Sequence, residues 1–289
     1  MNYEGIIIRP PSEADSIILQ VTVGCSHNHC TFCGAYKGVP FRLKEDAIID
    51  QDIEFASRHC TRQKRVFLAD GDVLILPQHR LENLFKRIRT QLPQVKRISL
   101  YGNGKSIRNK SLSELISLKK LGLSRIYLGV ESGDDHVLAE IKKGETAESL
   151  AAAGKKVMKS GIFLSTTVIL GIGGFKYSEK HASATASLLN RISPNQIAAL
   201  TLMVLENTPL AGQVHNKTFL LLDASGYLNE LRTLVENLSL DRVQFMANHS
   251  SNYLPISGRL ARDKERILLE IDQAILGYTD LVPDRLRAL

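Results

Sequence analysis

The stretch that decides the fold of this chain is Gly24-Cys25-Ser26-His27-Asn28-His29-Cys30-Thr31-Phe32-Cys33-Gly34. It carries three of the chain's four cysteines, and it directly follows an apolar, β-branched run at residues 17–23. Such a run predicts a buried strand. Three thiols on a loop at the end of a strand can converge on one metal centre, whereas an odd number of thiols cannot all pair in disulfides.

The composition is that of a globular protein with a large core. The chain has 289 residues, of which 44% are hydrophobic and 23% charged, and α/β barrels reach this length as one unit. The first residues do not resemble a signal peptide, and no apolar run reaches the roughly 18 residues of a membrane-spanning helix. We therefore predict a cytoplasmic protein without a membrane partner, whose thiols bind metal in a reducing compartment.

The net charge is +7, and its lysines and arginines are spread along the chain. No block of five or six like charges marks a nucleic-acid-binding tail. A solvated basic surface is the simpler interpretation. An anionic small molecule or an RNA substrate is the alternative.

Strand and helix patterns alternate from residue 17 to about residue 205. The predicted strands are 17–23, 65–69, 97–101, 125–130, 164–170 and 196–205. The predicted helices between them are 44–58, 77–91, 111–121, 135–141, 147–160 and 177–191. This alternation implies a parallel sheet with right-handed crossovers, and six strands are too few to close an eight-stranded barrel. We predict an α/β fold, a partial (β/α)6 TIM-like barrel, over residues 1–210.

Beyond Pro209 the alternation stops. Helical patterns at residues 225–238 and 262–276 flank a short strand pattern at 243–246. We predict that residues 211–289 form a C-terminal, mostly helical extension, which packs on the barrel and can close its substrate side.

Chemically active side chains follow nearly every predicted strand. In parallel α/β barrels the active site lies at the carboxyl ends of the strands. These ends carry the cysteine loop, Asp70-Gly71-Asp72, Asn103, Glu131 and Gly171-Ile172-Gly173-Gly174. One rim is therefore expected to combine thiols, carboxylates and a glycine-rich turn.

The thiols of Cys25, Cys30 and Cys33 fit an iron–sulfur cluster, which is usually held by four thiolates. With three, one iron stays open to chelate a ligand. The rival is a zinc site completed by His27 or His29, but a structural zinc would be oddly placed at an active rim. Cys60, alone at the end of a predicted helix, is typical of a small core residue.

With these residues the chain resembles the radical S-adenosylmethionine (SAM) superfamily, from about Leu19 to Leu210. In that family three cysteines follow the first strand, commonly with three and two intervening residues; here there are four and two. The resemblance implies a [4Fe-4S] cluster and SAM as cofactors. It implies reductive cleavage of SAM to a 5′-deoxyadenosyl radical that abstracts hydrogen from a substrate, an electron donor such as flavodoxin or ferredoxin, and sensitivity to oxygen.

The resemblance also assigns contacts to SAM. Phe32 matches the aromatic residue before the last cysteine, whose backbone contacts adenine. The Asp70-Gly71-Asp72 segment lies where the family has a Gly-Gly-Glu type motif, whose carbonyl groups receive the SAM ammonium group; capping of the next turn is the alternative for its two carboxylates. Asn103 and Ser106 are candidate polar contacts to the methionine or the ribose.

Two further strand ends complete the predicted cofactor site. Glu131 resembles the acidic residue that binds the ribose hydroxyls, with an ion pair to Arg125 as the alternative. The run with Gly171, Gly173 and Gly174 resembles the family's glycine motif beside adenine, although any tight turn after a strand could use glycines.

The predicted extension contains an unusual polar run at residues 248–256. It resembles a segment of anaerobic, coproporphyrinogen-oxidase-like radical SAM proteins. His249, Asn252 and Tyr253 are therefore candidate catalytic residues on the substrate side. The alternative is that these side chains only bind nearby backbone groups in a turn.

We therefore predict a radical SAM enzyme that acts on a small or medium-sized substrate, and the basic charge is compatible with an anionic one. The alternative from another class is a non-catalytic zinc-binding module that associates with nucleic acid through its basic surface. No appended RNA-binding domain is evident, so a nucleic-acid partner belongs to that alternative.

Overall fold

The computed structural model describes residues 1–288, and the chain divides into two compact units. The first unit comprises residues 1–28, 35–128 and 156–164. The second comprises residues 29–34, 129–155 and those from 165 onward. The cysteine loop is thus shared: Cys25 belongs to the first unit, and Cys30 and Cys33 belong to the second.

The first unit is built on parallel strands, in the order β1 (Ile17–Gln20), β4 (Arg65–Ala69), β5 (Arg97–Tyr101) and β6 (Leu123–Glu131), whose last three residues belong to the second unit. Its helices are α1 (Asp46–His59), α2 (Gln78–Gln91), α3 (Gly104–Asn109) and α4 (Leu112–Lys120). Shorter elements are η1 (Pro11–Glu13), η2 (Val73–Ile75) and the antiparallel pair β2 (Thr22–Val23) and β3 (Arg42–Leu43).

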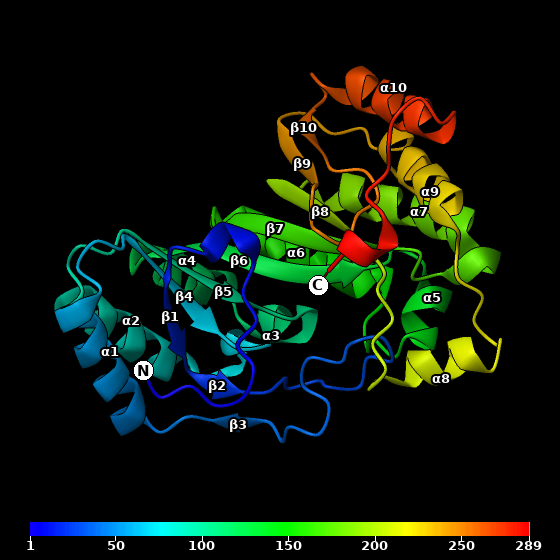
Figure 1. Ribbon diagram of the computed structural model, residues 1–289. Coiled ribbons are helices and arrows are strands. Elements are labelled where there is room, and N and C mark those ends of the chain that lie inside the picture. Colours follow the sequence, from blue (N-terminus) through cyan, green and yellow to red (C-terminus); the bar gives the residue numbers. More distant parts are fainter. Residues whose placement is uncertain (289) are drawn as a thin grey trace. The chain divides into compact units, whose positions relative to one another are not determined.

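Strand β4 lies in the core of the first unit because its side chains are apolar on both faces. Phe67 is fully buried, and its ring meets Tyr101 and Tyr127 at centroid distances of 5.1 and 6.1 Å. Helices α1 and α2 pack against each other (Figure 1). Helix α4 begins with the predicted capping box, in which Ser111 and Glu114 each bind the other's backbone N–H.

The second unit contains β7 (Phe163–Leu170), β8 (Gln196–Thr201) and β9 (Val243–Ala247), which are parallel, and β10 (Ile256–Leu260), which is antiparallel to β9. The first two residues of β7 belong to the first unit. The helices are α5 (Asp135–Glu140), α6 (Ala147–Ser160), α7 (Gly174–Ile192), α8 (Pro209–His215), α9 (Ala224–Glu236), α10 (Lys264–Ile275) and the short η3 (Asp284–Leu286), of which α6 ends in the first unit. Helix α9 packs on α7 and on α10 (Figure 1).

The predicted fold class is confirmed: the fold is α/β, with a mostly parallel sheet and a helix after each strand from β4 to β8. The first predicted strand is divided, because the chain leaves β4 after Gln20 and pairs with β3 instead. Residues 211–289 contain α9 and α10, and their strands β9 and β10 continue the sheet of the second unit. Within residues 1–288, no helix combines the length and the apolar character needed to cross a membrane.

Candidate cofactor site

A buried carboxylate organises the strand ends of the first unit. Asp72 is fully buried after β4. Its Oδ2 accepts hydrogen bonds from the Ser26 hydroxyl at 2.7 Å, the Ser106 hydroxyl at 2.5 Å and the Asn103 side-chain amide at 2.7 Å. Its Oδ1 accepts one from the Asn103 backbone at 3.3 Å. Three of the predicted cofactor-binding residues therefore meet at one carboxylate, beside the loop that starts with Cys25.

These hydrogen bonds hold the Asp72 carboxylate in one position and affect its pKa. Burial raises the pKa of Asp72, and the hydrogen bonds from Ser106 and Ser26 oppose that rise. Asn103 is in turn fixed as the N-cap of α3, where its side chain accepts from the Ser106 backbone N–H at 2.7 Å. Asp72 begins η2 but makes no capping bond with its side chain. Its acceptor positions are used to fix neighbouring side chains.

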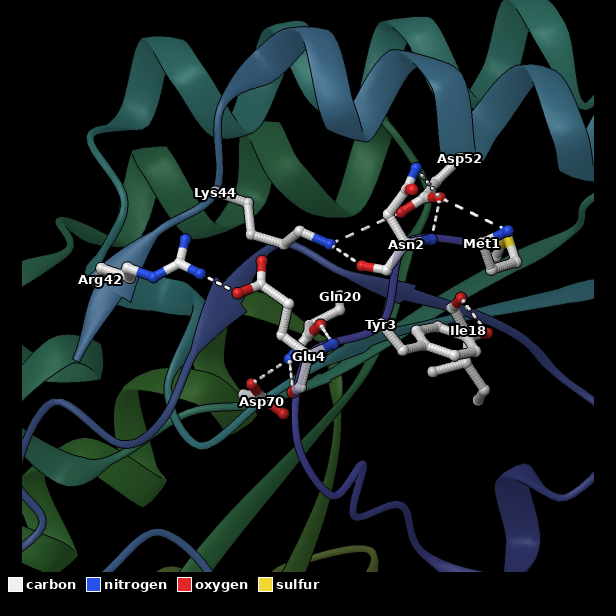
Figure 2. Close-up of polar contacts among 10 residues, drawn as sticks. All are labelled: Met1, Asn2, Tyr3, Glu4, Ile18, Gln20, Arg42, Lys44, Asp52 and Asp70. Carbon is white, nitrogen blue, oxygen red and sulfur yellow. Dashed lines mark hydrogen bonds and ion pairs between the residues drawn. The ribbon is translucent and has the colours of Figure 1, made fainter. Parts of the chain in front are cut away.

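Asp70 is held by a second set of contacts in the same unit. Its Oδ2 accepts from the Gln20 side-chain amide at 2.8 Å and from the Gly24 backbone at 3.2 Å. Burial raises its pKa, and these hydrogen bonds oppose the rise. Figure 2 shows Gln20 between Asp70 and Glu4, whose backbone both donates to Gln20 and accepts from it, at 2.9 and 3.0 Å.

The first residues of the chain are fixed beside this contact (Figure 2). The Asn2 backbone N–H donates to Asp52 Oδ1 at 2.6 Å, and Asp52 Oδ2 lies 3.7 Å from the ammonium group of Lys44. Lys44 is buried, which lowers its pKa, and its ammonium group also donates to the Asn2 carbonyl. The segment that meets Gln20 is thereby tied to β3 and α1.

Gly71 lies directly against the first cysteine. Its backbone N–H donates to the Gly24 carbonyl at 3.2 Å. A Cβ at position 71 would lie 2.9 Å from the Cβ and 3.2 Å from the sulfur of Cys25. Only glycine leaves room for this approach. The Asp70-Gly71-Asp72 turn and Cys25 therefore form one packed group, fixed on both sides by buried carboxylates.

The other two cysteines lie in the second unit, in residues 29–34. Cys30, Phe32 and Cys33 are half-buried. The Thr31 backbone N–H donates to the Ile141 carbonyl at 2.9 Å, and the Thr31 carbonyl accepts from the Leu210 backbone N–H at 3.0 Å. The Gly34 carbonyl accepts from the side-chain amide of Asn207 at 2.9 Å. Residues 31 and 34 are therefore held to the second unit by hydrogen bonds.

Glu131 ends β6 with a backbone φ of +63°, a conformation rare for residues other than glycine. Its carboxylate accepts a hydrogen bond from the Lys143 ammonium group at 2.8 Å and is 8% exposed. The expected partner Arg125 instead donates to the Tyr127 hydroxyl at 3.1 Å. The carboxylate thus pairs with Lys143 and not with Arg125, which lies six residues earlier on the same strand, roughly 20 Å away along an extended chain.

The glycine run follows β7 and begins α7. Gly171 and Gly174 have φ values of +80° and +60°, and Gly173 is the N-cap residue of α7. A Cβ at position 171 would overlap the ring of Tyr227. Glycine is therefore required at Gly171 both by the backbone conformation and by the neighbouring ring.

His249 and Asn252 make local contacts in the extension. The Asn252 side chain is buried; it accepts from the Thr201 hydroxyl at 2.8 Å and donates to the Ala199 carbonyl at 2.9 Å. His249 Nδ1 lies 3.0 Å from the Ser251 hydroxyl, and burial lowers the pKa of His249. These contacts fasten the turn after β9 to β8. A substrate role for the two residues stays a prediction.

Tyr253 also has protein partners. Its hydroxyl donates to Asp284 at 2.7 Å, and the guanidinium of Arg287 lies 3.7 Å from its ring centroid. Its ring contacts Tyr227, with the centroids 5.7 Å apart. Because Tyr227 packs on Gly171, the polar run of the extension is connected to the glycine turn.

Two buried residues at these strand ends were missed by the sequence analysis. His181 on α7 and Glu230 on α9 are each 2% exposed, and Glu230 Oε1 accepts from the Gly171 backbone N–H at 2.5 Å. A signal for Glu230 was present, since it lies among Tyr227, Leu228 and Leu231 on the apolar face of its helix. Helical periodicity predicts burial of such a position but not its partner.

The family model of the radical SAM superfamily matches residues 19–186, more than half of the chain. The chain belongs to the radical SAM superfamily. It is an enzyme of that class, and the superfamily uses a [4Fe-4S] cluster and SAM as cofactors. The predicted recognition is therefore confirmed. No curated protein sequence matches the chain.

Solved structures agree on the fold, that of a partial TIM barrel. Coproporphyrinogen III oxidase (HemN) from Escherichia coli has 17% identity and a TM-score of 0.58, over 76% of this chain and 51% of that one. Methylornithine synthase (PylB) has 14% identity and a TM-score of 0.56, over 88% and 68%. The radical SAM methyltransferase TsrM from Kitasatospora setae, solved with cobalamin and a [4Fe-4S] cluster, has 16% identity and a TM-score of 0.56, over 69% and 39%. The present chain thus spans well under two thirds of the length of TsrM and of HemN.

The residues present fit these cofactors in their chemistry. Three thiols are one fewer than a [4Fe-4S] cluster binds when it is fully ligated by cysteine, so one iron would be left for SAM. Gly71 brings its backbone against Cys25 without an intervening side chain, which lets a ligand of the cluster approach that backbone closely. The glycines after β7 are buried, and the ring of Tyr227 lies against Gly171.

Proposed function

We propose that Cys25, Cys30 and Cys33 hold a [4Fe-4S] cluster, and that the enzyme reductively cleaves SAM and removes hydrogen from a small or medium-sized substrate. The packing of Cys25 against Gly71, inside the segment matched by the superfamily model, carries this proposal. These three thiols would hold the cluster, which would supply the one electron needed for the reductive cleavage of SAM.

The chain's own residues have binding and positioning roles in this proposal. The carbonyl groups of residues 70–72 receive the SAM ammonium group, and Asp70 and Asp72 hold that turn through the networks described above. Asn103 and Ser106 add polar contacts from the start of α3. The hydrogen bonds of the two buried carboxyl groups of Asp70 and Asp72 hold the turn in one conformation.

The remaining contacts come from the second unit. Glu131 accepts hydrogen bonds from the ribose hydroxyls, with Lys143 orienting its carboxylate. The backbone of Phe32 and the turn with Gly171, Gly173 and Gly174 contact adenine. His249, Asn252 and Tyr253 act on the substrate side through the turn they stabilise.

The wider setting is part of the proposal. Residues 1–210 form the radical SAM barrel, and residues 211–289 form the extension that closes the substrate side. The net charge of +7 is compatible with an anionic substrate. We place the enzyme in the cytoplasm, with a flavodoxin or ferredoxin as the electron donor, and expect it to be inactivated by oxygen.

Anaerobic reconstitution with iron and sulfide tests the proposal. The protein is reduced with dithionite in the presence of SAM, and 5′-deoxyadenosine and bound metals are measured. The proposal expects iron and sulfide to bind and deoxyadenosine to form. One bound zinc and no deoxyadenosine would instead support the non-catalytic zinc-binding module.

A further inference from the structure

A chain of buried polar groups joins two strand ends of the second unit to helix α9. At one end is Ser132, which directly follows Glu131. At the other is Gly171, the first glycine of the turn after β7. Between them lie His181 on α7 and Glu230 on α9. Burying such groups is unfavourable unless each is hydrogen-bonded, so their placement constrains the surrounding turns.

Glu230 reaches the glycine turn from α9. Its Oε1 accepts from the Gly171 backbone N–H at 2.5 Å, and its Oε2 accepts from the Ser178 hydroxyl. Glycine has the greatest backbone freedom of all residues. A buried carboxylate that takes the N–H of Gly171 therefore restricts the turn at its most flexible position.

His181 continues the chain to the end of β6. Its Nδ1 lies 2.8 Å from the Ser132 hydroxyl, and its Nε2 lies 3.5 Å from Glu230 Oε1. Burial lowers the pKa of His181 to about 4, so the ring is neutral at physiological pH. The Ser132 hydroxyl also accepts from the Asp134 backbone N–H at 3.0 Å. The neutral ring thus orients the turn that contains Glu131.

We propose that Glu230 and His181 are positioning residues for SAM, which hold the Glu131-Ser132 turn and the Gly171 turn in one fixed relation without touching the cofactor. The inference rests on the proposed function, because it takes these two turns as the ribose and adenine contacts. Through Glu230, helix α9 of the C-terminal extension then contributes to the affinity for SAM.

Two substitutions of Glu230 test the inference. Glu230→Leu removes both acceptors at similar volume. Glu230→Gln keeps an oxygen for Gly171 but loses the charge that the carboxylate carries at pH 8, the pH at which binding is measured. The matched control is Glu236→Gln, on the same helix but with its side chain 54% exposed. The dissociation constant for SAM is measured by equilibrium dialysis on cluster-loaded protein without reductant. Deoxyadenosine formation at saturating SAM is measured separately.

We expect Glu230→Leu to weaken SAM binding about tenfold and Glu230→Gln about threefold, equivalent to about 1.4 and 0.7 kcal/mol. The control stays within about twofold, and the rate at saturating SAM is retained in the folded protein of every variant. A merely structural role would lower the folded fraction at an unchanged dissociation constant.

Unchanged SAM affinity in both Glu230 variants would overturn the inference. If Glu230→Leu does not fold, Glu230→Gln alone decides, and an affinity equal to wild type overturns it. A wild-type protein that carries its cluster but does not bind SAM would refute the proposed function itself, which separates the two failures.

Discussion

Asp72 in the first unit and Glu230 in the second are both buried carboxylates that hold a turn at a strand end, but their partners differ in origin. The partners of Asp72 come from the segments that follow neighbouring strands: Ser26 from the loop after β2, and Asn103 and Ser106 from the start of α3. Glu230 comes from α9, far along the chain, and reaches back to Gly171 and to Ser178 on α7. The first network is a local property of the barrel's strand ends, whereas the second makes a strand end depend on the extension.

The two carboxylates also differ in how their charge is supported. Asp72 accepts four hydrogen bonds. Glu230 accepts two, and burial raises its pKa to about 7. Loss of Asp72 removes more hydrogen bonds than loss of Glu230, and we therefore expect it to be more costly.

The largest expected effect is that of Asp72→Ala. It leaves the donors of Ser26, Asn103 and Ser106 without their acceptor, and we expect a loss of about 4 kcal/mol in the free energy of unfolding. Urea unfolding of the protein measures this. Asp15→Asn, at a side chain 88% exposed, is the control and should change stability by less than about 0.5 kcal/mol. A loss of under about 1 kcal/mol in Asp72→Ala would show that the network is not structural.

Next is the pH dependence contributed by Glu230. Its pKa is raised from 4.5 to about 7 in the folded protein, so the folded state binds more protons than the unfolded state between these values. Stability from this group is present below pH 4.5 and is lost as pH rises through about 7. Glu230→Gln removes this dependence. We expect the variant to gain up to about 3 kcal/mol relative to wild type between pH 4.5 and pH 8.

Urea unfolding at a series of pH values measures that gain. His181 lies 3.5 Å from Glu230 and titrates in the opposite sense, because burial lowers its pKa to about 4. The comparison is therefore made above about pH 5, where this ring is neutral in both proteins. Parallel stability curves for wild type and Glu230→Gln would contradict the raised pKa.

The two glycine turns can be compared directly. Gly171→Ala combines a backbone φ of +80° with overlap of the Tyr227 ring, and we expect it to cost about 3 kcal/mol. Gly71→Ala meets Cys25 at 2.9 Å without a positive φ, and should cost about 1–2 kcal/mol. Gly212→Ala is the control, since nothing lies within 4 Å of its Cβ in α8. Equal losses in the free energy of unfolding for Gly171→Ala and Gly71→Ala would show that the two turns restrict substitution to the same degree.

The smallest expected effect is that of Tyr253→Phe. It removes the hydrogen bond to Asp284, whose side chain is 79% exposed, and leaves the ring contacts in place. We expect a loss of about 0.5 kcal/mol in thermal or urea unfolding. If deoxyadenosine formation falls tenfold while stability is unchanged, Tyr253 acts on the substrate side, as the sequence predicts.

Much of the fold could be predicted, because β4 to β8 are short apolar runs separated by helical patterns and turn residues. Strand β10 was missed because Gly258 lies at its centre and Pro255 directly precedes it, two features that weaken a strand pattern. The proximity of Asp72, Asn103 and Ser106 could be predicted, because each follows the end of a predicted strand. Their mutual hydrogen bonds could not be predicted, because these depend on side-chain conformations that no sequence spacing specifies.

The hydrogen bonds of Glu230 could not be predicted from the sequence for a different reason. The helix pattern at residues 225–238 correctly predicts an apolar face, but it does not say which distant turn that face covers. Partners 59 residues apart along the chain, such as Gly171 and Glu230, are set by tertiary packing.

The cysteine series tests the central claim most directly. Cys25→Ala, Cys30→Ala, Cys33→Ala and Cys60→Ala are each reconstituted anaerobically, and deoxyadenosine formed from SAM is measured with bound iron. Cys60 caps the end of α1 and is only half-buried. We expect loss of deoxyadenosine in the first three variants, by more than about a thousandfold, and wild-type formation in Cys60→Ala. Equal loss in all four, or retained formation in any of the first three, would contradict the assignment of the cluster.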